Sequence, residues 1–209
     1  LANDGDLATT SLSSPGFPQI AWTEEGGPYT VKYGGPPPAP LVSSSTHPDQ
    51  SRWFSDNDPS FTWTCDDRFG GITGYSYWLD QNPGTIPDEI SEGTETSTGY
   101  TDKEDGTWYF HVKAQNIYGW GATAHYQINI DATPPGAPTG VTANPSGWTS
   151  TNSFSVNWNN PLDTSGIQGA YYKLDGVPTS DTDGTWTTSK PISGITVSGD
   201  GAHPIYIWL

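Results

Sequence analysis

Four things are scarce or missing in this sequence. It has one cysteine, no methionine, only 7 Lys and Arg against 23 Asp and Glu, and no apolar run close to the ~18 residues of a membrane-spanning helix. A single cysteine, Cys65, excludes an intramolecular disulfide, and its phase with neighbouring aromatics predicts a small buried hydrophobe. The formal net charge of −16 repels phosphate backbones and anionic lipid. We therefore expect neither nucleic-acid binding nor membrane insertion.

Glycine, proline and aromatic residues are abundant instead. The chain has 25 Gly, 19 Pro, 10 Trp, 11 Tyr and 6 Phe in 209 residues. Glycine and proline punctuate helices at a cost, whereas large rings at alternating positions can fill a core between sheets. The composition predicts short strands joined by turns, which is an all-β fold.

A repeat with a constant offset of 95 residues organises the chain. Trp63 and Trp158, Leu79 and Leu174, and the flanking Trp53 and Trp148 all obey this offset. Other pairs at the same offset are Gly71 and Gly166, Asp80 and Asp175, Asp105 and Asp200, and Gly106 and Gly201. Two copies in register over about 60 residues indicate two similar units.

Alternation within the first copy predicts two facing sheets. Strands are expected near 41–45, 60–65, 72–80, 107–115 and 122–130. Each places large apolar residues at every second position. The inward sets are Phe61, Trp63 and Cys65; Tyr75, Tyr77 and Leu79; Trp108, Phe110, Val112 and Ala114; and Tyr126, Ile128 and Ile130. Burial on one face of each strand predicts a β-sandwich of the immunoglobulin-like class.

Several motifs resemble tandem fibronectin type III and bacterial Ig-like repeats of extracellular surface proteins. They are Phe61-Thr62-Trp63, Gly71-Ile72-Thr73-Gly74-Tyr75, the stretch from Gly106 to Asn116, Val156-Asn157-Trp158 and Asp163-Thr164-Ser165-Gly166-Ile167. The resemblance covers residues 36–132 and 133–209, which we expect to be two tandem fibronectin type III-like sandwiches. It implies binding, spacing or adhesion, and rarely catalysis.

Residues 1–35 are expected to form a short three-stranded β-meander followed by a proline-rich linker. The alternating segments are Asp6–Leu12, Pro18–Thr23 and Tyr29–Tyr33. The sequences of these segments weakly resemble the last blade of a bacterial β-propeller repeat. The run from Gly34 to Pro40, like that from Asp131 to Pro138, favours a semi-rigid joint.

The second copy is expected to lack its last strand. Its final residues, Ile205–Leu209, align with Phe110–Ala114, whereas the first copy continues through a further strand. Two interpretations stay open, a shortened sequence or an open edge that accepts a strand from a neighbouring subunit. Residues before 34 are the candidate donor in the second case.

Motifs for catalysis and for metals are missing. There is no Gly-x-Ser-x-Gly or His-Glu-x-x-His, and the four histidines lack metal-ligand spacing, so no cofactor or metal site is expected. Calcium stays open at the acidic turns Asp56-Asn57-Asp58, Asp181-Thr182-Asp183 and Asp200, which offer hard oxygen ligands. None of them completes a twelve-residue calcium loop.

Side chains on the outer faces of the predicted sheets form the candidate binding surface. In the first copy these are Trp78, Tyr109, His111 and His125; in the second, Tyr171, Lys173, Tyr206 and Trp208. Grouped exposed rings can stack on sugars or contact a protein. Cross-strand pairing that only stiffens the sheet is the alternative.

The leading hypothesis is a non-enzymatic extracellular module: a rod-like spacer, an adhesin or a subunit of a cell-surface filament that assembles by strand complementation. Its partners would be other copies of itself or other surface proteins. The alternative is a carbohydrate-binding accessory region of a larger secreted hydrolase, with glycans as partners. A polysaccharide-binding assay separates the two.

Overall fold

The computed structural model describes residues 34–68 and 70–209. This part of the chain is built from strands and contains no helix, which confirms the all-β prediction. No helix among these residues is therefore long and apolar enough to cross a membrane. The predicted meander and propeller-like blade before residue 34 lie outside the described residues.

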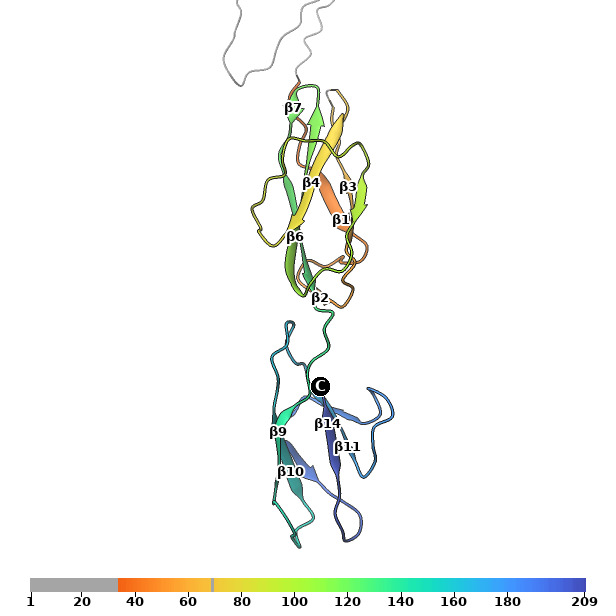
Figure 1. The fold of residues 1–209 in the computed structure, drawn as a ribbon, viewed down its shortest axis with the longest axis vertical. Coiled ribbons are helices and arrows are strands. Elements are labelled where there is room, and N and C mark those ends of the chain that lie inside the picture. Colours follow the sequence, from red (N-terminus) through yellow and green to blue (C-terminus); the bar gives the residue numbers. More distant parts are fainter. Residues whose placement is uncertain (1–33, 69) are drawn as a thin grey trace, which may run out of the picture. The chain divides into compact units, whose positions relative to one another are not determined.

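The first sandwich consists of a three-stranded sheet packed against a larger sheet (Figure 1). The smaller sheet has the order β1-β3-β5, and the larger has β2-β8-β6-β4 with β7 paired to β6. Their bounds are β1 (Leu41–Ser44), β2 (Trp53–Phe54), β3 (Ser60–Thr64), β4 (Gly74–Asp80), β5 (Ser97–Gly99), β6 (Gly106–Asn116), β7 (Gly119–Trp120) and β8 (Ala124–Ile130). Of these, β1, β3, β4, β6 and β8 match the five strands predicted from alternation to within two residues at each end.

The second sandwich repeats most of this plan. Its sheets have the orders β13-β10-β9 and β12-β11-β14. Their bounds are β9 (Thr139–Asn144), β10 (Phe154–Asn159), β11 (Ala170–Leu174), β12 (Thr185–Thr187), β13 (Ile192–Ile195) and β14 (Ile205–Trp208). The 95-residue offset relates β3 to β10, β4 to β11, β5 to β13 and β6 to β14.

The chain also divides into two compact units, although Ser51–Asp58 and Thr101–Thr107 are grouped with the second unit. The hydrogen bonding of β2 to β8 and of β6 to β4 ties these stretches to the first sandwich.

Aromatic packing builds the core of the first sandwich. Phe61 of β3 and Phe110 of β6 stack with centroids 4.3 Å apart, and Trp63 meets Tyr75 edge-on at 5.6 Å. Each of these four rings is buried. Facing sheets bring the rings together because alternate positions on β3 and β6 point into the same layer. Such pairs add about 0.5–1.5 kcal/mol each beyond the area that they bury.

The predicted linker before residue 41 is packed onto the first sandwich. Asn116 Nδ2 donates to the Gly35 carbonyl at 2.8 Å, and the buried Pro37 lies so close to Gly121 that a Cβ there would collide with its carbonyl. Cys65 Sγ also approaches the Pro38 carbonyl at 3.4 Å. This stretch is thus part of the edge of the sandwich rather than a free joint.

Candidate functional site

Three of the four predicted outer-face residues of the first sandwich reach solvent. Trp78 is 60% exposed, His125 is exposed and Tyr109 is half-buried. His111, however, has none of its surface exposed. The prediction that His111 contributes to an exposed aromatic face is therefore wrong.

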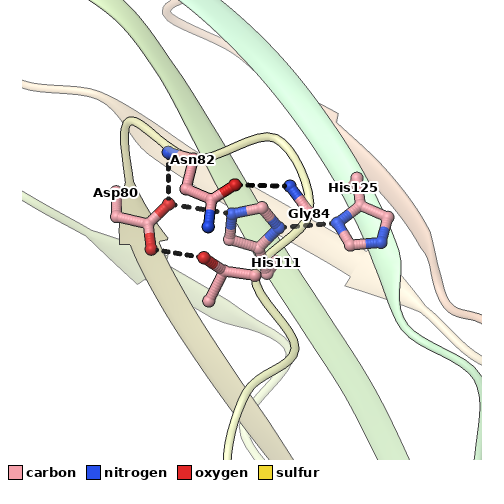
Figure 2. A network of polar contacts seen from close by, with 6 residues as sticks. Asp80, Asn82, Gly84, His111 and His125 are labelled. Atoms are coloured by element: carbon pink, nitrogen blue, oxygen red, sulfur yellow. Dashed lines mark hydrogen bonds and ion pairs between the residues drawn. The ribbon is translucent and has the colours of Figure 1, made fainter.

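The turn after β4 covers the His111 ring (Figure 2). Asp80 organises this turn, because its carboxylate accepts from Asn82 N at 2.8 Å and from Thr85 Oγ1 at 2.6 Å. The Asn82 side chain then accepts from Gly84 N at 3.1 Å. Asp and Asn side chains of this kind stabilise tight turns, and here the turn folds back over the sheet.

His111 lies between a carboxylate and a second imidazole. Its Nε2 is 3.2 Å from Asp80 Oδ1, and its Nδ1 is 2.6 Å from His125 Nδ1 (Figure 2). When Nε2–H donates to Asp80, the neutral Nδ1 must accept the proton that His125 donates. Burial lowers the pKa of His111, although Asp80 opposes the shift. The buried His111 is thus bonded through both ring nitrogens, to Asp80 on one side and to the exposed His125 on the other.

Two further polar residues on the outer face of this sheet, Ser76 and Lys113, are also covered. Ser76 Oγ donates to Asp88 at 3.2 Å, and both Ser76 and Lys113 are buried. The Lys113 ammonium lies 5.1 Å from the centroid of the Trp120 ring, which is a favourable cation–π distance. The first sandwich therefore exposes Trp78 and His125 on this face, and Tyr118, 41% exposed, in the turn after β6, but no continuous row of stacked rings is recorded for the described residues.

A row of three aromatic rings crosses the outer sheet of the second sandwich. In the strand register Tyr171 is opposite Trp186 on one side and opposite Trp208 on the other. The centroids of Tyr171 and Trp186 are 5.0 Å apart, and those of Tyr171 and Trp208 are 5.7 Å apart. We call these three residues the aromatic row. Trp186 is its most open member, with 47% of its surface exposed.

Two glycines hold the row in place. A Cβ at Gly169 would collide with the Trp186 ring, and one at Gly184 would collide with the Trp208 ring. The Trp208 indole N–H also donates to the Asp181 carbonyl at 2.6 Å. The rings thus lie against bare backbone, which fixes their orientation without a binding partner.

Sequence reasoning named Tyr171 and Trp208 but missed Trp186. Its repeat counterpart, Ser91, is polar, so the 95-residue offset gave no hint. A local signal was available. The sequence of Asp183-Gly184-Thr185-Trp186 is identical to that of Asp105-Gly106-Thr107-Trp108, where β6 begins.

Charged groups flank the aromatic row. Lys173, two residues beyond Tyr171 on the same strand, pairs with Asp183 at 2.7 Å and lies opposite Tyr206. Thr179 Oγ1 donates to the same carboxylate oxygen at 2.7 Å. Lys173 and Thr179 lower the pKa of Asp183 to about 2. Hydroxyl, ammonium and carboxylate groups thus surround an apolar strip.

Two of the acidic turns named for calcium make contacts within the protein. Asp58 Oδ1 accepts from Asp102 N at 2.9 Å, and Asp183 is paired with Lys173. Within residues 34–68 and 70–209, no three His, Cys, Asp or Glu side chains gather where they could hold one metal ion. Cys65 is half-buried rather than fully buried, and burial, with Asp67 and Asp66, raises the pKa of its thiol.

Comparisons with known proteins return structural likenesses only. No family model matches the chain, and no curated protein matches it. The chain is similar to the FN1–FN3 domains of chicken CNTN1, with 17% identity and a TM-score of 0.37 over 87% of this chain. It spans 64% of that chain. It is also similar to the PKD domain of an M14-like peptidase from Thermoplasmatales archaeon SCGC AB-540-F20, with 19% identity and a TM-score of 0.33 over 46% of this chain and 97% of that one.

Proposed function

We propose that this chain is a non-enzymatic extracellular module that acts by contact, as an adhesive and structural unit of a surface protein or filament. The aromatic row is the observation that carries the proposal. Three rings from three neighbouring strands, fixed from below by Gly169 and Gly184, form a prearranged contact surface. Trp and Tyr dominate binding energy at protein interfaces because they bury a large area with little loss of side-chain freedom.

The polar clusters of the described residues support contact rather than catalysis. The imidazole of His111 is sealed beneath a turn, and the Lys173–Asp183 pair neutralises its own charges. His203 bonds Asp175 at 2.9 Å, and this bond raises the pKa of His203. Its Nε2 also donates to the Gly199 carbonyl at 3.3 Å, so both ring nitrogens are bound to groups of the protein itself.

Glycan binding is the second candidate function, and the surroundings of the aromatic row favour it. Sugar rings present apolar faces that stack on aromatic side chains and hydroxyl groups that need polar partners. Lys173, Asp183 and Thr179 supply such partners beside the rings. A carbohydrate-binding accessory region would use the same row on a polysaccharide.

The test compares Trp186→Ala with Trp78→Ala in the full chain. Both residues are exposed tryptophans on strands, but only Trp186 belongs to the aromatic row. Self-association is measured by sedimentation over a concentration series, and retention is measured on a panel of insoluble polysaccharides. We expect Trp186→Ala to weaken one of these by about tenfold or more and Trp78→Ala to leave it unchanged.

The outcome decides between the two functions. Loss of self-association in Trp186→Ala supports the adhesive unit, and loss of polysaccharide retention supports the glycan-binding region. Wild-type chain that shows neither behaviour, or equal losses in both variants, contradicts a role for the aromatic row. Far-UV circular dichroism and rescue by Trp186→Phe, which keeps a ring, show that the variant still folds.

A further inference from the structure

A groove of about 790 Å³ opens toward the core of the second sandwich. One wall is made by residues 145–154 and the other by residues 197–205, while Val156, Leu174 and Ile195 also line it. Val156 and Ile195 belong to the buried apolar core. The groove is thus bounded by the core layer of the sandwich and does not include the aromatic row.

The same place in the first sandwich is filled by β8. Subtracting the 95-residue offset turns the two walls into residues 50–59 and 102–110. The first of these stretches contains β2, which pairs in parallel with β8 through Trp53 opposite Asn129 and Phe54 opposite Ile130. The second contains the start of β6, the other neighbour of β8 in the sheet. The groove therefore lies where a β8-type strand lies in the sister unit.

Contacts across β6 and β8 give the direction of such a strand. Thr107 bonds Asn129, and four residues later His111 meets His125, so the two strands run antiparallel. Continuing that register puts Phe110 opposite Tyr126 and Trp108 opposite Ile128. The offset carries these positions to Ile205 and His203, and both residues line the groove.

Burial differs between the sister units in the way that this position predicts. Phe110 and Val112 are completely buried, but their counterparts Ile205 and Ile207 are only partly buried. Trp148 is 87% exposed, whereas its counterpart Trp53 is half-buried. Among the described residues, β14 is hydrogen-bonded to β11 on one side only, whereas β6 lies between β4 and β8.

We propose that this groove binds one extended polypeptide strand with the chemistry of β8, antiparallel to β14. The partner strand carries large apolar side chains at alternate positions, as Tyr126, Ile128 and Ile130 do, and uncharged polar residues between them. Only Asp200 and His203 among the groove residues are titratable, so an uncharged strand such as β8 suits it. Backbone amides of β14 supply the affinity, and the apolar alternation supplies the specificity.

The experiment titrates the full chain with a labelled peptide of residues 121–132. Fluorescence anisotropy gives the affinity, and amide chemical shifts locate the site. The control peptide has the same composition with neighbouring residues exchanged, which moves its apolar side chains to the opposite face of the strand. We expect the native peptide to bind with shifts at residues 145–154 and 197–205, and the control to bind at least about tenfold more weakly.

A matched pair of variants tests the groove itself. Trp148→Ala removes an exposed ring from one wall, and Trp78→Ala removes an exposed ring from outside the groove. We expect Trp148→Ala to weaken binding of the peptide by about tenfold and Trp78→Ala to leave it unchanged. Trp148 is so exposed that its loss does not threaten folding.

Three results would overturn the proposal. One is no binding of the native peptide at millimolar concentration, and another is equal binding of the in-phase and out-of-phase peptides. The third is concentration-dependent self-association that Trp148→Ala abolishes and that blocks the peptide, which would make a second copy of this chain the occupant.

Discussion

At the scale of single residues, the proton count of His111 is limited by what surrounds it. Asp80 and His125 meet its two ring nitrogens, and a 2.6 Å contact between Nδ1 atoms has room for one proton. Two protonated imidazoles would direct two N–H groups at each other at that distance. The Tyr109 ring lies with its centroid 6.4 Å from that of His111. The two Nδ1 atoms therefore cannot both carry a proton, and burial lowers the pKa of His111.

The first sandwich should lose stability on mild acidification. The pKa of His111 is lowered by burial in the folded state and is about 6.5 in the unfolded state. As the pH falls below about 6.5 the unfolded chain takes up the proton first, so the free energy of unfolding decreases. Urea titrations at pH 7.5, 6.5 and 5.5, with hydrogen exchange at Phe110 as the readout, measure the free energy of unfolding of the first sandwich. His111→Gln should flatten the dependence.

His203 is the control with the opposite sign. Asp175 raises its pKa, so its contribution to the stability of the second sandwich is complete below about pH 6.5 and is lost as the pH rises through the raised value. Hydrogen exchange at Val156 reports on that unit. A decrease of equal size in both units on acidification would contradict the assignment to His111.

At the scale of single elements, β6 and β14 show what a neighbouring strand contributes. They are sister strands in the repeat, but β6 has hydrogen-bonded strands on both sides and β14 has one. Residues 110–114 are all buried, whereas every residue of β14 is only partly so. An edge with free backbone groups opens locally at low cost.

Amides of β14 should exchange with solvent at least about tenfold faster than those of β6, a factor that corresponds to about 1.4 kcal/mol of local opening free energy. Native-state hydrogen exchange read by mass spectrometry or NMR measures both strands in one sample. The β8 peptide should slow exchange in β14 and leave β6 unchanged. Equal protection of the two strands without the peptide would mean that the β14 edge is already covered.

Repeat and alternation were enough to predict the main strands of the first copy and most of its buried side chains, although Cys65, Tyr77 and Trp108 of the predicted inward sets are only partly buried. Trp63 and Trp158, which hold the same position in the repeat, are both buried. Alternation with a period of two residues predicts which face of the sheet a side chain lies on. It does not predict whether another segment covers that face. His111 was mispredicted for this reason, because the covering turn depends on Asp80 and Thr85 contacts that no period contains.

At the scale of the whole molecule, the two sandwiches have unequal cores. Ten buried apolar residues of the described chain lie in the first sandwich and five in the second. The ten are Phe61, Trp63, Tyr75, Leu79, Phe110, Val112, Ala114, Tyr126, Ile128 and Ile130; the five are Val156, Trp158, Ala170, Ile192 and Ile195. Burying one large apolar side chain stabilises a fold by about 1.5–3 kcal/mol, of which the conformational entropy of a longer ordered chain offsets part.

The second sandwich should therefore unfold first on heating, below the first by about 8–16 °C, the shift expected for about 2 kcal/mol in units of this size. Calorimetry with hydrogen exchange at Phe110 and Val156 assigns the transitions.

Trp63→Ala and Trp158→Ala are a matched pair, since each removes a buried ring at the same place in the repeat at a cost of about 3–5 kcal/mol. Trp158→Ala should abolish the lower transition and leave the upper one in place. Saturating β8 peptide should raise only the lower transition, because a ligand that binds the folded unit stabilises that unit alone. Unfolding of the first sandwich before the second would show that the smaller core is compensated by interactions other than apolar burial.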